Sequence, residues 1–171
     1  MSTIDRAVQS CLKQPQVREI ILVDDGSSDG TPDLLAVYAA KHDHIKVCVL
    51  SHNSGAAMTR NFGVLHSHAP YLAFLDADDE YLEHAFAFSI DALQSILELA
   101  AVKLPCQFVG WPDDVTTHAS FTETSNILSN TFAGNLLIRR EVFLALGMFP
   151  DAPAFRVQGG EDGAFMKALA N

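Results

Sequence analysis

The chain has 171 residues and an apolar content that is ordinary for a folded protein, so it fits one domain with a sizeable core. Its formal net charge of −10 disfavours nucleic acid and anionic membrane surfaces as partners. Cys11, Cys48 and Cys106 are odd in number and widely spaced, which indicates a reducing compartment and neither a disulfide framework nor a zinc site.

In the first half of the chain, short apolar runs alternate with segments of helical periodicity. Continuous apolar runs are typical of buried strands in a parallel sheet, whereas apolar residues three or four positions apart predict amphipathic helices. In chain order, we expect a helix over 4–14, a strand over 19–23, a helix from 31, a strand over 45–50, a helix after 55 and a strand over 71–75.

Two of these strands end in carboxylates. Asp24 and Asp25 follow the first strand, and Asp76, Asp78 and Asp79 follow the strand over 71–75. The carboxyl ends of the strands are where open α/β sheets bind ligands. Three carboxylates in four residues repel one another, so the second cluster calls for a cation, and hard oxygen ligands suit Mg²⁺ or Mn²⁺. The alternative is an acidic turn that merely precedes a helix.

A cationic residue lies near the start of the third predicted helix. Arg60 and Asn61 fall in its first turns, after the turn at residues 53–55. A helix N-terminus with a nearby arginine can bind an anion. The alternative for Arg60 is a solvated surface charge.

The second half of the chain is less regular. Its 112–129 stretch is polar, rich in threonine and weakly periodic, which predicts an irregular loop. The expected elements are a helix over 81–99, a strand over 107–111, a strand over 136–138, a helix over 141–146, a flexible loop over 159–163 that carries Glu161 and Asp162, and a helix over 164–170.

The alternation of strands and helices predicts an α/β fold, a three-layer α/β/α arrangement around a mostly parallel sheet, as a single domain over residues 1–171. Neither the dinucleotide-binding glycine fingerprint nor a P-loop is present in the sequence. No segment is long and apolar enough to span a membrane, and no secretory signal opens the chain. We therefore expect a cytoplasmic protein, either free or peripheral to the inner face of the membrane.

Four blocks resemble the motifs of family 2 glycosyltransferases and follow the family's order. They are Val23 to Thr31, Asn53-Ser54-Gly55 with Arg60-Asn61, the D-x-D stretch Phe74 to Asp79, and Gly160-Glu161-Asp162; the segment Gly134 to Arg140, with Gly147 and Phe149, also looks like the family segment before the last block. The resemblance covers nearly the whole chain. It implies the GT-A fold, in which a nucleotide-sugar-binding sheet carries a metal at its carboxyl edge.

The resemblance implies roles for the acids on the donor side. By position, Asp25 would hydrogen-bond the nucleotide base, with Asp24 beside it. Asp76 would lie near the ribose and the metal, and Asp78 would bind Mn²⁺ or Mg²⁺. Arg60 would add positive charge near the diphosphate. The donor would be a nucleoside-diphosphate sugar, and uridine is the commonest base in the resembled family.

On the acceptor side, the resemblance implies that Asp162 is the general base, with Glu161 as its neighbour. The reaction would be metal-dependent, inverting transfer of a sugar to a hydroxyl of a carbohydrate or lipid-linked acceptor. The donor would bind within residues 1–80 and the acceptor would meet residues 81–171.

The chain departs from the family pattern at its start. The family begins with a strand that ends in a Pro-Thr-x-Asn-like turn, whereas this sequence begins at the helix that follows. We therefore expect a domain truncated at its N-terminus, with low stability or a stabilising homo-oligomer. This leaves open a truncated domain that binds a nucleotide or a partner without catalysis.

A second alternative is a phosphotransferase of the haloacid-dehalogenase kind. In that class an apolar strand ends in D-x-D and the first aspartate, here Asp76, is the nucleophile. The threonine or valine expected after the second aspartate is Glu80, and the Asp24–Asp25 block would have no role.

Overall fold

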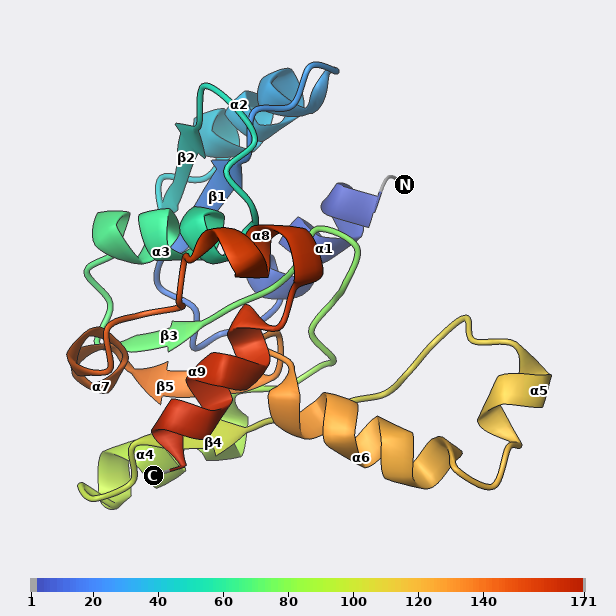
Figure 1. The fold of residues 1–171 in the computed structure, drawn as a ribbon. Helices are drawn as coiled ribbons and strands as arrows, with labels where there is room; N and C mark the ends of the chain where they lie inside the picture. The colour runs from blue at the N-terminus through green and yellow to red at the C-terminus, as the bar shows by residue number, and fades with distance from the viewer. Residues whose placement is uncertain (1–2, 171) are drawn as a thin grey trace.

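The computed structural model describes residues 3–170 and contains two sheets flanked by helices (Figure 1). The first sheet pairs β1 (Ile20–Asp24) with β2 (Ile45–Val49) in parallel, with Asp24 opposite Val49. The connection between them is α2 (Thr31–Lys41), which carries a proline in its first turn. The parallel pairing that the alternation of strand and helix predicted is confirmed in this sheet.

Helices α1 (Thr3–Leu12) and α3 (Ala56–His66) complete this half of the molecule. Val8 of α1 is buried in the same apolar cluster as residues of β1 and β2, as the helical periodicity predicted. Helix α3 packs on β1, where a Cβ on Gly63 would lie 3.2 Å from the Val23 side chain. Glycine at this position therefore lets the helix and the strand approach closely.

Glu19, immediately before β1, joins three segments of the chain. Its carboxylate pairs with Lys46 Nζ at 2.6 Å and accepts hydrogen bonds from the Ser67 hydroxyl at 2.8 Å and the His68 N–H at 2.9 Å. Burial alone would raise the pKa of Glu19, but these contacts outweigh it and lower the pKa to about 2.

We expect Glu19→Gln to lower the free energy of unfolding at neutral pH by about 1 kcal/mol and to flatten its dependence on acid pH. The folded-state pKa of this carboxyl is depressed below its ordinary value of 4.5, so its stabilisation is present above that value and is lost as the pH falls toward about 2. Urea midpoints measured across this range check the prediction, with Glu98→Gln as a control at an exposed glutamate. Equal acid slopes in wild type and Glu19→Gln would contradict it.

The second sheet is antiparallel. Its strands are β3 (Tyr71–Ala73), β5 (Leu136–Arg139) and β4 (Ala101–Lys103), and β5 lies in the centre. Tyr71 pairs with Arg139, and Lys103 pairs with Leu136. The strand direction differs here from the mostly parallel sheet expected from the sequence. The first three residues of β5 are all buried. A fully buried apolar run does not tell whether the strand pairs in parallel or antiparallel.

Two elements of the second half lie elsewhere than expected. The helix predicted over 81–99 is shorter, α4 (Ala87–Ser95), and it is preceded by a turn at residues 83–86. The Tyr81 hydroxyl donates to the Phe74 carbonyl at 2.6 Å, and His84 has a positive φ of 60°. The strand predicted over 107–111 is wrong, because the strand at this edge of the sheet is β4.

The irregular loop predicted over 112–129 is also wrong. The segment contains α5 (Asp113–Thr116) and α6 (Phe121–Thr131), which project from the body of the molecule (Figure 1). Threonine hydroxyls donate to carbonyls one turn earlier, as from Thr117 to Asp113 at 2.7 Å and from Thr131 to Ile127 at 3.0 Å. These bonds satisfy the threonine hydroxyls but do not themselves favour a helix. The sequence missed α6 because none of its residues is buried and its apolar periodicity is weak.

The main core is built from phenylalanine rings. Phe74, Phe143, Phe149 and Phe165 lie with neighbouring ring centroids 4.9 to 5.2 Å apart. They come from the end of β3 and from the segments around α7 (Arg140–Ala145), α8 (Pro153–Gln158) and α9 (Glu161–Leu169). The core therefore anchors α9 next to the residues that follow β3.

None of the helices described is long and apolar enough to cross a membrane. The three cysteines are free thiols. Burial raises the pKa of Cys11 to about 11, although a hydrogen bond with Ser10 opposes this. Cys11 is therefore a neutral packing residue at physiological pH rather than a nucleophile.

Candidate active site

The acids that follow β1 fix the backbone around the end of the strand. Asp24 is only 3% exposed, and its Oδ2 accepts the Ser27 N–H at 3.0 Å. Asp25 accepts the Ser54 N–H at 2.7 Å on Oδ1 and the Gly55 N–H at 2.9 Å on Oδ2. Asp24 thus orders the loop after β1, and Asp25 holds that loop against the N-terminus of α3.

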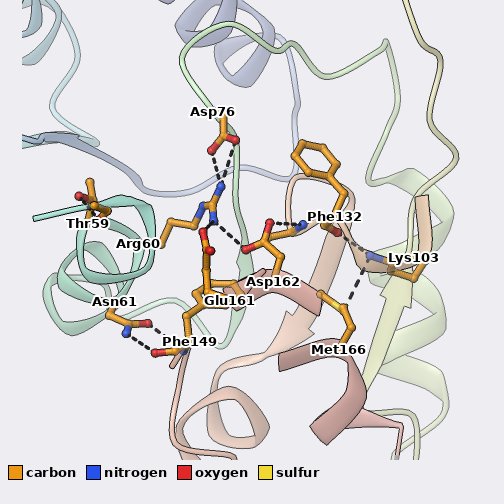
Figure 2. A network of polar contacts seen from close by, with 12 residues as sticks. Thr59, Arg60, Asn61, Asp76, Lys103, Phe132, Phe149, Glu161, Asp162 and Met166 are labelled. Carbon is orange, nitrogen blue, oxygen red and sulfur yellow. Dashed lines mark hydrogen bonds and ion pairs between the residues drawn. The ribbon is translucent and has the colours of Figure 1, made fainter. Parts of the chain in front are cut away.

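Arg60 of α3 is the centre of a cluster of acids from distant parts of the chain (Figure 2). Its Nη2 binds Asp76 at 2.8 and 3.0 Å from the two carboxylate oxygens. Its Nη1 donates to Asp162 Oδ1 at 2.7 Å and lies 3.5 Å from Glu161 Oε1. The guanidinium also lies over the Phe149 ring, 5.6 Å from its centroid. We call Arg60, Asp76, Glu161 and Asp162 the Arg60 cluster.

The Arg60 cluster sets one cation against three carboxylates. Burial would lower the pKa of Arg60, but Asp76 and Asp162 outweigh it and raise the pKa, so the guanidinium stays charged. Burial raises the pKa of Asp162; Arg60 and a backbone N–H oppose this, and Glu161 and Asp76 raise it further. Asp162 is therefore a better proton acceptor than an ordinary aspartate.

Glu161 and Asp162 occupy the first turn of α9, where a flexible loop was expected. The helix begins after Gly160, whose φ of 94° is in the left-handed region. Carboxylates are stabilised near a helix N-terminus by the orphan N–H groups and the helix dipole. The Ala133 N–H donates to Asp162 Oδ2 at 3.1 Å, so both oxygens of this carboxylate are held.

Asn61 holds the segment beneath the cluster; the sequence placed it in the Arg60-Asn61 block but gave it no role of its own. Its amide donates to the Phe149 carbonyl at 2.9 Å and accepts the Phe149 N–H at 3.0 Å, with Asn61 only 7% exposed. The adjoining residues Arg60 and Asn61 therefore have separate tasks: one binds acids and the other fixes the Phe149 backbone. The sequence signal that could have pointed to Asn61 was its position next to Arg60 in the same motif block.

The turn after β3 carries the carboxylates predicted to bind a metal. Asp78 and Asp79 are exposed, and the Asp79 N–H donates to the Asp76 carbonyl at 3.1 Å. Burial raises the pKa of Asp79, and the charges of Asp78 and Asp76 raise it further. This mutual repulsion is what a cation would relieve.

These donors fit a hard divalent ion such as Mg²⁺ or Mn²⁺ bound jointly with a ligand. Within the part of the chain that the structure describes, no three His, Cys, Asp or Glu side chains gather closely enough to hold an ion alone. Such ions commonly take one or two protein carboxylates and complete their coordination with phosphate oxygens and water. Asp78 and Asp76 suit that arrangement, with Asp76 shared with Arg60.

A cavity of about 230 Å³ lies between the start of α3 and the start of α9. It is lined by Ser54, Gly55, Ala56, Ala57, Asp151, Phe155, Gly159 and Glu161. The turn that Asp25 holds thus forms one wall and Glu161 forms the other. The structure brings Arg60, Asp76, Glu161 and Asp162 into contact, and this cavity lies between the Asp25-bound turn and that cluster.

Comparison with known proteins gives a consistent family match. The family model "Glycosyl transferase family 2" matches residues 2–144. The chain is 36% identical over 141 residues to "Putative teichuronic acid biosynthesis glycosyltransferase TuaG" of Bacillus subtilis, covering 79% of this chain and 55% of that protein. It is also 36% identical over 77 residues to the succinoglycan biosynthesis protein ExoU of Rhizobium meliloti, covering 45% of this chain and 22% of that protein.

Solved structures with the same fold include two that are bound to nucleotide sugars. The mannosyltransferase PcManGT of Pyrobaculum calidifontis, in complex with GDP-Man and Mn²⁺, matches with a TM-score of 0.69 and 22% identity over 95% of this chain and 46% of its own. TarS of S. aureus in complex with UDP-GlcNAc matches with a TM-score of 0.71 and 19% identity over 96% of this chain and 48% of its own. The chain thus has the GT-A fold and spans about half the length of TuaG, PcManGT and TarS.

Proposed function

The chain belongs to glycosyl transferase family 2, and from the Arg60 cluster we propose that it transfers a sugar from a nucleoside-diphosphate sugar to an acceptor hydroxyl with inversion. The observation that carries the proposal is the placement of Asp162. Its carboxylate is held on both oxygens, has a raised pKa and is joined through Arg60 to Asp76 at the end of β3. The family match removes the support for the phosphotransferase alternative.

Asp162 is the general base in this proposal. It takes the proton of the acceptor hydroxyl as the oxygen bonds to the anomeric carbon, and the bond from that carbon to the diphosphate breaks with its electron pair. Each Asp162 oxygen accepts one hydrogen bond and keeps a further lone pair for the incoming proton. Glu161 adds negative charge that favours proton uptake.

The donor occupies the edge formed by the loops after β1 and β3, within residues 1–80. In this proposal Asp25 and the neighbouring Asp24 lie at the nucleotide base, and Asp76 lies at the ribose. Asp78 and Asp76 would hold Mn²⁺ or Mg²⁺, which when bound neutralises the charge that develops on the departing diphosphate. The acceptor, a carbohydrate or lipid-linked carbohydrate, meets residues 81–171.

Arg60 connects the two sides of the reaction. Its guanidinium binds Asp76 and Asp162 with different nitrogens, at 2.8 and 2.7 Å. It therefore fixes the distance between the donor side and the base, and it also brings positive charge toward the leaving diphosphate. The Asn61 bonds to Phe149 hold the ring beneath it.

We expect nucleotide sugars to raise the Tm of the protein only when a divalent ion is present. A ligand at a hundredfold excess over its Kd should raise the Tm by about 5–10 °C for a chain of this size. A thermal-shift screen of UDP-GlcNAc, other UDP-sugars and GDP-mannose, each with and without Mn²⁺, makes the measurement; Mn²⁺ alone is the control. The absence of a shift with every donor in Mn²⁺ would contradict the proposed function.

A further inference from the structure

Lys103 is the last residue of β4. It lies on the opposite side of Asp162 from Arg60 (Figure 2). Its Nζ donates to the Phe132 carbonyl at 2.6 Å, to Asn135 Oδ1 at 2.5 Å and to Met166 Sδ at 3.8 Å. An ammonium has three N–H donors, so these contacts use all of them. Two of the partners are in the turn between α6 and β5, and the third is on α9, one helical turn after Asp162.

The other hydrogen bonds of the Asn135 side chain determine which of its atoms faces Lys103. Its side-chain nitrogen donates to the Leu104 carbonyl at 3.0 Å and to the Ser129 carbonyl at 2.9 Å, which leaves its oxygen for Lys103. Asn135 is only 4% exposed, so these bonds are shielded from water. The amide therefore ties the end of α6 and the residue after β4 to the same ammonium.

The turn that Lys103 holds is the one that contacts the proposed base. Between the two Lys103 partners, the Ala133 N–H donates to Asp162 Oδ2 at 3.1 Å. Ala133 is fully buried, and a Cβ on the next residue, Gly134, would lie 2.3 Å from the Phe132 ring. The turn is therefore closely packed, and small movements of Phe132 or Asn135 would move the Ala133 N–H.

We propose that Lys103 is a positioning residue for the transfer reaction: by holding the Phe132 carbonyl and the Asn135 side chain, it fixes the Ala133 N–H that orients Asp162. This inference rests on the proposed function, because it takes Asp162 as the base. Lys103 lies behind the turn, and its three hydrogen bonds go to Phe132, Asn135 and Met166 rather than to Asp162. Burial lowers the pKa of Lys103 while Cys106 and Asp162 raise it, so the ammonium and the Asp162 carboxylate stabilise one another.

The test is a double-mutant cycle between Lys103→Met and Asp162→Asn. The assay is the release of nucleoside diphosphate from the donor that gives the largest thermal shift with Mn²⁺. Lys103→Met should lower kcat by about tenfold to a hundredfold, the scale of a misplacement of about 1 Å, and change the donor KM by less than about twofold. In the Asp162→Asn background the same change should cost less than about twofold, because no base remains to be positioned.

Matched variants separate positioning from folding. Lys103→Arg keeps cationic donors near Phe132 and should restore kcat in part, and Lys41→Met, at an exposed lysine of α2, should leave kcat and Tm unchanged. If Lys103→Met does not fold by circular dichroism, Lys103→Gln, which keeps a donor, enters the same cycle. Equal losses in both backgrounds, or a parallel loss of donor affinity, would overturn the role of Lys103. Unchanged turnover in Asp162→Asn itself would instead overturn Asp162 as the base in the proposed function, on which this inference rests.

Discussion

Replacing Asp162 with asparagine is expected to lower kcat for sugar transfer by about a thousandfold, the usual scale of general-base catalysis. Asparagine keeps the size of the side chain and an oxygen that can face Arg60 Nη1, but it cannot take a proton. Donor binding should survive, because the acids proposed to hold the nucleotide and metal follow β1 and β3. Steady-state kinetics with saturating donor, together with donor titration calorimetry, separate the two effects.

Two further variants sharpen this prediction. Glu161→Gln should cost less than about tenfold, because Glu161 lies farther from Arg60, at 3.5 Å, and acts on Asp162 through its charge. Asp91→Asn removes an exposed carboxylate from α4 and should have no effect. Normal turnover by Asp162→Asn with a collapse in Glu161→Gln would show that the base is the neighbouring residue.

Replacing Asp78 with alanine is expected to weaken donor binding in the presence of Mn²⁺ by about a hundredfold, because a metal bridge to a diphosphate contributes several kcal/mol. In the absence of metal, the variant and the wild type should bind the donor equally weakly. Calorimetric titration of the donor with and without Mn²⁺ measures both affinities.

The control for Asp78 is the neighbouring carboxylate Glu80. Glu80→Ala removes the same charge from the same exposed turn, so an effect confined to Asp78 would indicate ligation rather than a general change in potential. Equal donor affinity of Asp78→Ala and wild type in Mn²⁺ would contradict the metal assignment. That result would not affect the role of Asp162, because the Asp78 test measures donor binding whereas the Asp162 test measures kcat.

The strands and acids proposed to bind the donor could be predicted because the sequence patterns that mark them are local. Apolar runs that lead directly into Asp24–Asp25 and Asp76 require no knowledge of distant residues, and both are strands in the structure at nearly the expected positions. Arg60 was expected near the start of its helix, where it lies. The two acids that it hydrogen-bonds are 16 and 102 residues away, and only the family resemblance linked the second of them to the site.

The contacts that the sequence did not predict are mostly those between side chains and backbone atoms. Asn61 and Lys103 bind main-chain atoms of Phe149 and Phe132, which carry no residue-specific signal. The start of α9 at Glu161 was missed because two glycines precede it and read as a flexible loop. One of them, Gly160, takes a left-handed conformation just before the helix begins. Asp162, which was expected in a flexible loop, is therefore held in the first turn of a helix and paired with Arg60.

In the proposed reaction, Asp162 activates the attacking oxygen on the face of the sugar opposite the leaving diphosphate. The most direct test uses water as the acceptor: the protein is incubated with Mn²⁺ and an α-linked UDP-sugar, and the released sugar is followed by proton NMR before it mutarotates. A single displacement directed by Asp162 predicts that the β-anomer appears first. Initial release of the α-anomer would contradict this account.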